Sequence, residues 1–336
     1  MNELDAFLTR SGLAGADVER RWTPLSGGVS SDIWRVDLAD GTTVCVKRAL
    51  EKLKVAADWN APVSRNAYEW AYLQFAAKMM PEAVPRPLAH DPEACLFAMS
   101  WLEPAAYPVW KTQLLEGHVD PETAHAVGAT LARLHGASAN RKDLAESFDT
   151  TEMFASLRLE PYLAHTALKH PRLSPALHRL IETTATNRSA LVHGDVSPKN
   201  ILVGPQGPVI LDAECAWYGD PAFDIAFCLN HLLLKAVPRP DRVGELRASF
   251  DAFVEGYFTE GSPEPRAGLE ARSAALLAAL LLARVDGKSP VEYIATDAER
   301  DRVRAASIPL IEHPASRLAD VASQAYPRLA SRGDIA

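Results

Sequence analysis

Near the start of the chain, apolar and polar residues alternate along residues 33–38, and residues 42–47 form a run rich in β-branched residues. Alternation with a period of two is typical of β-strands that bury one face. A helical spacing of apolar residues occurs instead over residues 1–20 and 65–73. A further apolar run, residues 96–102, has the pattern of a strand and stops just before a proline. This part of the chain is therefore expected to form a small β-rich unit with two helices.

The remainder of the chain has mainly the period of helices. Asp120, followed by proline, is a typical helix start, and Gly136 is a typical stop. Residues 140–190 are helical in pattern with mixed charge. Two more helices are expected near residues 242–258 and 266–284, the second rich in alanine and leucine.

These patterns place a boundary near Glu103, where the apolar strand gives way to a proline-containing crossover. The chain of 336 residues is long enough for two domains with cores of their own. We therefore predict an α+β fold with two lobes. Residues 1–103 form a small β-rich N-terminal lobe, and residues 104–336 form a larger, mostly helical C-terminal lobe.

Two short apolar runs, residues 201–203 and 209–211, flank a loop rich in glycine and proline, and this pattern predicts a β-hairpin. Closure of the hairpin would bring Asn200 and Asp212 side by side. Two such oxygen donors suit a hard cation such as Mg²⁺. Asp195 precedes Asn200 by five residues, in a tight His-Gly-Asp turn. This order of an Asp, an Asn and a later metal-binding Asp serves phosphoryl transfer in the protein-kinase fold.

The segment from His193 to Asn200, followed by the segment from Asp212 to Asp224, resembles the aminoglycoside phosphotransferase and choline kinase superfamily. The aromatic-Tyr-Gly step at residues 217–219 is most similar to methylthioribose kinases. The resemblance implies a bilobal protein-kinase-like fold. It also implies ATP- and Mg²⁺-dependent phosphoryl transfer to a hydroxyl group of a small molecule, such as a sugar, thiosugar, amino alcohol or aminoglycoside. GTP in place of ATP is left open.

On this resemblance the N-terminal lobe would bind the nucleotide. Two glycines and a serine lie between strand-like stretches, where backbone N–H groups could approach phosphate. A strand-end lysine would neutralise the α- and β-phosphates, although a solvated lysine is the alternative. In the family, a helix glutamate holds this lysine, and the backbone of the hinge could bind an adenine edge. The candidate residues are Gly27, Gly28 and Ser30 for the loop, Lys47 and Glu69 for the pair, and Ser100 and Trp101 for the hinge.

The C-terminal lobe would carry the catalytic loop and the acceptor site. We expect Asp195 to orient and deprotonate the acceptor hydroxyl, and Asn200 and Asp212 to hold Mg²⁺. Lys199 could reach the γ-phosphate or the acceptor, with a solvated lysine as the alternative. Glu214 could assist at the metal or fix the loop.

Other polar residues have structural interpretations. His135 ends an apolar helical face, and a satisfied core histidine is expected there. In the family, the residue at Asp224 bonds to backbone N–H groups of the catalytic loop. Residues 140–190 lie where small-molecule kinases build the acceptor pocket. The turn at residues 284–290 could face that pocket or only end a helix.

Composition narrows the classes of partner. The net charge of −8 argues against a general binder of nucleic acids or anionic membranes. The N-terminus has no basic segment followed by an apolar core, and the longest apolar run, residues 274–283, is too short to span a membrane. The four cysteines are scattered, and reduced thiols are expected. We expect a cytoplasmic protein whose partner is a small hydroxyl acceptor, with a homodimer left open.

Two alternatives share part of this pattern. A protein kinase would need an activation segment, yet no Phe-Gly pair follows Asp212 and no Ala-Pro-Glu occurs after it. A non-catalytic nucleotide-binding regulator would be expected to lack one of the four key residues, all of which are present: Lys47, Asp195, Asn200 and Asp212. A small-molecule kinase is therefore the favoured interpretation.

Overall fold

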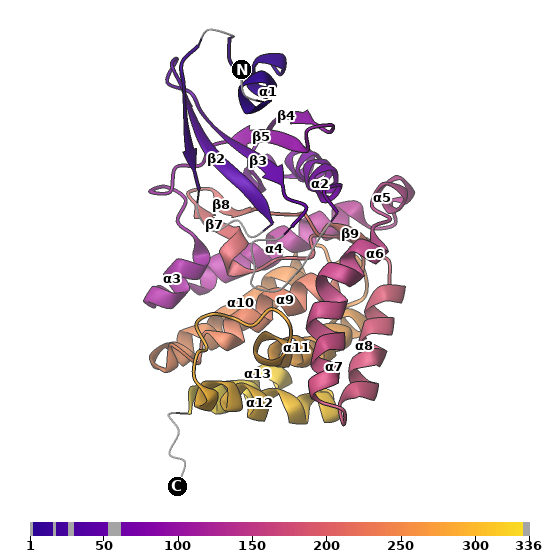
Figure 1. Ribbon diagram of the computed structural model, residues 1–336. Helices are drawn as coiled ribbons and strands as arrows, with labels where there is room; N and C mark the ends of the chain where they lie inside the picture. Colours follow the sequence, from indigo (N-terminus) through magenta and orange to yellow (C-terminus); the bar gives the residue numbers. More distant parts are fainter. Residues whose placement is uncertain (1–2, 16–17, 26–29, 53–61, 332–336) are drawn as a thin grey trace.

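The computed structural model describes residues 3–15, 18–25, 30–52 and 62–331. The N-terminal part is a five-stranded antiparallel sheet in the order β1-β2-β3-β5-β4. Its strands are β1 (Arg20–Pro24), β2 (Ser31–Leu38), β3 (Thr43–Ala49), β4 (Pro87–Asp91) and β5 (Leu96–Ser100). Helices α1 (Glu3–Arg10) and α2 (Arg65–Met79) accompany this sheet, which lies above the helical part of the chain in Figure 1.

Strand alternation decides which helix each side chain of the sheet meets. Val44 and Val46 of β3 pack with Leu4, Phe7 and Leu8 of α1 in one apolar cluster. Successive side chains of a strand point to opposite faces, so Lys47 points away from α1 and towards α2.

The first helix is shorter than the sequence pattern predicted. We expected a helix over residues 1–20, but α1 ends at Arg10 and residues 20–24 form β1. Gly12 follows the helix with φ of 72°, a left-handed conformation that glycine adopts at little cost and that turns the chain out of the helix. Leu13, predicted for the helical face, still packs on the same apolar cluster.

The C-terminal part is mostly helical, as predicted. Its longer helices are α4 (Pro121–Ser138), α8 (Ser174–Thr186), α9 (Ala222–Leu234), α10 (Val243–Thr259), α11 (Arg266–Asp286), α12 (Asp297–Glu312) and α13 (Leu318–Ala330). Short helices are α3 (Trp110–Glu116), α5 (Lys142–Ser147), α6 (Thr151–Phe154) and α7 (His165–Lys169), with a π-helix over Ala155–Ala164 and 3-10 turns at Pro81–Ala83, Pro198–Asn200 and Pro240–Arg242. Helix α9 is buried along its whole length, which explains why it is apolar on all sides.

Two small hairpin-like sheets lie at the junction of the two parts. Strands β7 (Ile201–Gly204) and β8 (Gly207–Ile210) form the predicted hairpin, with Ile201 opposite Ile210. Strand β6 (Ala190–Val192) pairs with β9 (Trp217–Gly219), a strand that the sequence pattern did not predict. The predicted boundary at residue 103 lies just beyond the end of β5 and stays a prediction.

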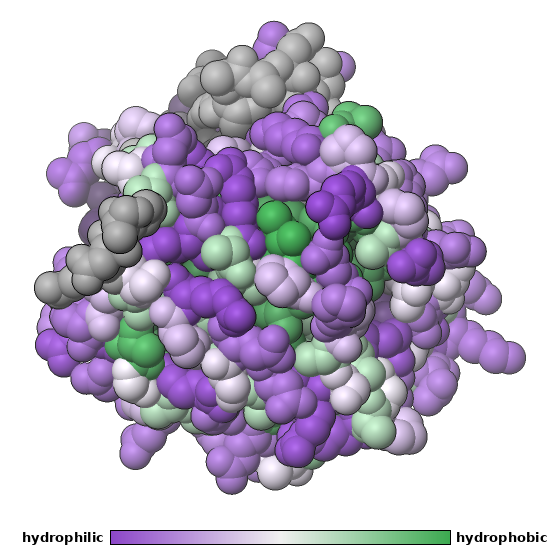
Figure 2. Space-filling model, turned by 90° about the horizontal axis from the view of Figure 1, so that it is seen from below, coloured by the Kyte–Doolittle hydropathy of each residue, from purple (hydrophilic) through white to green (hydrophobic). Residues whose placement is uncertain are grey.

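The surface of the helical part is mainly hydrophilic on the face opposite the sheet, with only separate hydrophobic spots (Figure 2). Among the described residues, no helix combines the length and the apolar character needed to cross a bilayer. All four cysteines are free, and Cys45, Cys215 and Cys228 are buried, as expected for reduced thiols.

Candidate active site

The turn at His193-Gly194-Asp195 begins where β6 ends. Gly194 has φ of 81°, and a Cβ atom at this position would lie 2.6 Å from the carbonyl oxygen of Cys215. Any other residue would therefore strain the turn and push against the neighbouring backbone. The glycine lets the chain reverse so that Asp195 follows it directly.

Asp224, in the first turn of α9, holds this turn in place. Its two carboxylate oxygens accept hydrogen bonds from the backbone N–H groups of His193 at 2.7 Å and Gly194 at 2.8 Å. The ring of His135 lies 3.1 Å from Asp224 Oδ2 and 2.8 Å from the hydroxyl of Tyr257. Burial opposes ionisation of Asp224, but the hydrogen bond and charge of His135 and the interactions with His193 together outweigh it and lower the pKa of the carboxyl. Both structural interpretations, for Asp224 and for His135, are confirmed.

The carboxylate of Asp195 is surrounded by donors. It is only 5% exposed. Its Oδ2 lies 3.1 Å from the guanidinium of Arg158, 3.2 Å from Lys199 Nζ and 3.0 Å from Asn200 Nδ2. The charge of Asp195 raises the pKa of Lys199. Lys199 thus contacts the predicted base instead of lying free in solvent, although its side chain is half exposed.

The β7–β8 hairpin brings the predicted metal pair together. The N–H of Leu211 donates to the carbonyl of Asn200 at 2.8 Å, so the residues that flank the hairpin are adjacent. The amide nitrogen of Asn200 donates to Asp195, so a metal ligand from this side chain would be its oxygen. Asp212 has φ of 70°, a conformation that Asp tolerates better than most residues and that concentrates at functional sites.

Lys47 bridges the two parts of the molecule. Its Nζ donates to Glu69 Oε1 of α2 at 2.7 Å and also contacts Asp212. Burial alone would lower the pKa of Lys47, but Asp212 and Glu69 together outweigh burial and raise it. The pKa of Asp212 is lowered, because Lys47 and Lys199 outweigh burial. The predicted Lys47–Glu69 pair is therefore present and extends to Asp212.

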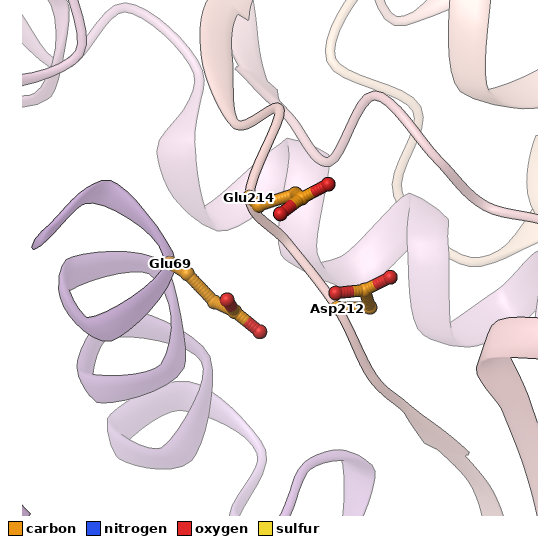
Figure 3. A group of neighbouring side chains, drawn as sticks. All are labelled: Glu69, Asp212 and Glu214. Carbon is orange, nitrogen blue, oxygen red and sulfur yellow. The ribbon is translucent and has the colours of Figure 1, made fainter. Parts of the chain in front are cut away.

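A group of three carboxylates surrounds this ammonium. Ligand oxygens of Glu69, Asp212 and Glu214 all lie within 4.8 Å of one another, and the side chains converge from α2 and from the segment after β8 (Figure 3). Arg65 pairs with Glu214 at 3.1 Å. Burial and the charges of Asp212 and Glu214 raise the pKa of Glu69, and the ammonium of Lys47 offsets part of this rise.

This donor set fits a hard divalent cation. Three carboxylates face two cationic side chains, so negative charge is in excess, and all ligand atoms are oxygens. Lys47 donates a hydrogen bond to Oδ1 of Asp212. A divalent cation beside that oxygen would be repelled by the ammonium of Lys47. The oxygen of Asn200 and the other oxygen of Asp212 are therefore the more suitable pair. The assignment of Mg²⁺ to these two residues stays a prediction.

Comparison with known proteins places this geometry in a family. The model of the phosphotransferase enzyme family (APH) matches residues 21–259. The chain belongs to this family. It is 28% identical over 252 residues to the methylthioribose kinase of Escherichia coli O45:K1, a match that covers 65% of this chain and 60% of that kinase's length. The predicted resemblance to this superfamily, with a distant likeness to methylthioribose kinases, is confirmed.

Solved structures of other kinases and phosphotransferases share the fold. The amicoumacin kinase in complex with AMP-PNP, Ca²⁺ and its ligand has a TM-score of 0.59 at 15% identity, with 96% of this chain and 97% of that chain covered. A macrolide 2′-phosphotransferase from Brachybacterium faecium has a TM-score of 0.53 at 18% identity, with 97% and 98% covered. The predicted α+β, kinase-like fold is thereby confirmed.

The remaining candidates are those that the sequence predicts for nucleotide binding. Gly27 and Gly28 fall outside the described residues. Ser30 is buried, and its carbonyl accepts from Arg65 at 2.5 Å. The N–H of Ser100 already donates to the carbonyl of Arg86 at 2.9 Å, so only its carbonyl could serve a nucleotide. Trp101 directly follows β5, with its ring stacked under the guanidinium of Arg35.

Sequence reasoning missed two arginines. Arg158, on the π-helix, contacts both Asp195 and the carbonyl of Gly194. Arg65, at the first position of α2, is 1% exposed and joins the carbonyls of Ser30 and Leu50 to Glu214. Neither residue belongs to a short motif, and no local pattern marks it. Glu214 thus has the loop-fixing contact that was one of its two predicted interpretations.

Proposed function

We propose that the protein transfers the γ-phosphoryl group of ATP, with Mg²⁺, to a hydroxyl group of a small molecule such as a sugar, thiosugar, amino alcohol or aminoglycoside. The observation that carries the proposal is the buried Asp195, held by Arg158, Lys199 and Asn200 beside the Lys47–Asp212 contact. Residues 1–103 would bind the nucleotide, and residues 104–336 would supply the catalytic loop and the acceptor site.

Each side chain then has a stated task. Asp195 orients the acceptor hydroxyl and takes its proton. Lys47, held by Glu69, binds the α- and β-phosphates, and Asn200 and Asp212 would hold the cation. When bound, Mg²⁺ offsets the negative charge of the phosphate oxygens.

The segment after Asp212 supports a small acceptor. Only nine residues separate Asp212 from Ala222, the first residue of α9. Three of them form β9, which pairs with β6. A segment that short and that firmly paired leaves no room for a phosphorylatable activation loop with a peptide-docking platform. The π-helix over Ala155–Ala164 holds Arg158 against Asp195, and with the helices around it, from residues 151–186, it could wall off a pocket that excludes water.

The test is a screen of nucleotide consumption. ATP and GTP are each supplied with Mg²⁺ and with sugars, thiosugars, amino alcohols, aminoglycosides or unstructured peptides that contain Ser, Thr and Tyr. We expect at least one small alcohol to be phosphorylated, with kcat/KM far above that of any peptide. The Asp195→Asn variant is the matched control for contaminating kinases. Efficient phosphorylation of peptides with every small alcohol inert would refute the proposal in favour of a protein kinase.

A further inference from the structure

Lys235 directly follows α9 and is fully buried. Its ammonium has no hydrogen-bond partner within the described structure and rests over the ring of Tyr293, 3.9 Å from the centroid. Burial, with a smaller contribution from Lys111, lowers the pKa of Lys235 to about 7. Burial of an uncompensated ammonium costs free energy. The protein keeps this lysine despite the cost, which suggests that its charge has a role other than stabilising the fold.

Two other cationic side chains face the same region. The ammonium of Lys111, on α3, lies 6.0 Å from the centroid of the same Tyr293 ring and pairs with Glu292. Arg284, near the end of α11, donates to the hydroxyl of Tyr162 at 3.0 Å and to the carbonyl of Ser289 at 2.5 Å, but its Nε is buried without a hydrogen-bond partner among the described residues. The carboxylate of Glu292 is 66% exposed, and it is a weak counter-charge for three cations.

A continuous series of contacts joins this group to the catalytic base. The guanidinium of Arg284 lies 5.4 Å from the ring of Tyr162, and that ring lies 5.6 Å from the ring of Phe227. The guanidinium of Arg158 lies 5.9 Å from the centroid of the Phe227 ring and 3.1 Å from the carboxylate of Asp195. Helix α9, helix α11 and the π-helix thus form a wall that extends from Arg284 to Asp195.

We propose that Lys235 and Arg284, with Lys111 beside them, form a subsite for an anionic group of the acceptor, a carboxylate or a phosphate ester. The inference rests on the proposed phosphotransferase function and narrows its substrate class. Cations such as amino alcohols and aminoglycosides are disfavoured, since they would meet like charge in a buried setting. A hydroxylated acid or a sugar phosphate would instead supply the counter-charge that the folded protein lacks.

The binding test needs no turnover. Thermal unfolding of the wild type is measured at pH 6.5 with glucose, gluconate or glucosamine, and in parallel with glycerol, glycerol 3-phosphate or choline. Inorganic phosphate is a further probe. A ligand that binds only the folded state raises the unfolding temperature. We expect a concentration-dependent rise with gluconate, which would indicate a carboxylate, or with glycerol 3-phosphate, which would indicate a phosphate ester.

The Lys235→Met variant tests whether the rise depends on this residue. We expect its affinity for the anion to fall at least 10-fold, while Lys169→Met, which removes an exposed lysine of α7, keeps the wild-type affinity. Without ligand, Lys235→Met should be more stable than the wild type, because it removes a buried unpaired charge. A purely structural lysine would lose stability instead.

The pH dependence follows from the groups around Lys235. The charges of Lys111 on α3 and Arg284 on α11 lower the pKa of Lys235, and the charge of Glu292 beyond α11 raises it. Burial has the largest effect and lowers it. Because the folded pKa of about 7 lies below the ordinary value of 10.5, the stability penalty is fully present below pH 7 and is relieved as pH rises towards 10.5. The stabilisation by Lys235→Met should therefore be larger at pH 6 than at pH 9. Anion affinity of the wild type should fall as pH rises through about 7.

Three outcomes would overturn the subsite: no anion stabilises the wild type, Lys235→Met retains the affinity, or glucosamine or choline stabilises the wild type more than its anionic counterpart. Failure of the proposed function would look different. In that case the subsite binds anions as described, but the nucleotide screen yields no phosphorylated small molecule.

Discussion

Replacement of Asp224 by asparagine would show how much the catalytic loop depends on one buried carboxylate. Asp224 is fully buried and accepts two hydrogen bonds from backbone N–H groups, those of His193 and Gly194. Asparagine has nearly the same shape but only one acceptor oxygen. The side-chain amide nitrogen, which is a donor, would therefore face one of the two backbone N–H groups, which is also a donor.

The expected cost can be added from these contacts. One buried N–H loses its partner, which costs about 1–3 kcal/mol. The second hydrogen bond loses the assistance of a full charge, about 1 kcal/mol, and the contact with His135 is weakened. We expect Asp224→Asn to lower the free energy of unfolding by roughly 3 kcal/mol. A loop displaced by about 1 Å beside the base should also lower kcat by roughly 100-fold.

Equilibrium unfolding in urea at pH 7 measures the first quantity, and steady-state kinetics with the acceptor found in the screen measures the second. Asp149→Asn is the matched control, since Asp149 is 64% exposed and pairs with Arg188 at the surface. The control should change stability by less than about 1 kcal/mol. The lowered pKa of Asp224 means that its contribution is present at neutral pH and is lost as pH falls through that pKa. Unchanged stability and kcat in Asp224→Asn would refute the positioning role.

Four further substitutions test the proposed chemistry. Asp195→Asn should lower kcat by roughly 100-fold or more with little change in nucleotide affinity, measured by steady-state kinetics and calorimetry, and near-normal turnover would remove Asp195 from the mechanism. Asp212→Ala should abolish Mg²⁺-dependent nucleotide binding and Asn200→Ala should raise the Mg²⁺ concentration required; a nucleotide complex with the cation more than about 3 Å from both side chains would contradict the assignment. Glu69→Gln keeps a hydrogen-bond acceptor for Lys47 but removes the charge, so nucleotide affinity should fall roughly 10-fold, and an unchanged affinity in a calorimetric titration would count against the pair.

The parts of the site that could be predicted are those that depend on local order. The spacing of Asp195 and Asn200, together with the hairpin, places Asp212 beside them because a hairpin returns the chain to its starting edge. Short-range rules sufficed for these three residues. The pairing of Lys47 with Glu69 was predicted from the resemblance to the family, while the strand and the helix that carry them were predicted from the local pattern.

Arg158, Arg65 and Lys235 could not be predicted, since each depends on packing between elements distant in the sequence. Arg158 lies on a π-helix that contains Pro161, where the ordinary helical period does not tell which side chains share a face. In the sequence, Arg65 has the pattern of a solvent-exposed residue in the first turn of a helix. Lys235, after a long apolar helix, has the pattern of a solvated lysine near a helix C-terminus, and only the later segment that carries Tyr293 buries it.

The residues on the two sides of Asp195, the proposed base, differ in charge. The carboxylates of Glu69, Asp212 and Glu214 converge on the proposed nucleotide side, while on the proposed acceptor side Lys235 Nζ and Arg284 Nε have no hydrogen-bond partner among the described residues. A phosphotransferase that transfers a phosphoryl group from ATP to an anionic acceptor must bring two anions together in a site of low dielectric constant. Their repulsion is strong there. A cation held by the carboxylates and a cationic wall behind the acceptor would each offset one of these anions. A cationic acceptor would instead lie beside the cationic wall and be repelled by it. This difference between anionic and cationic acceptors is the physical basis of the proposed preference for anions.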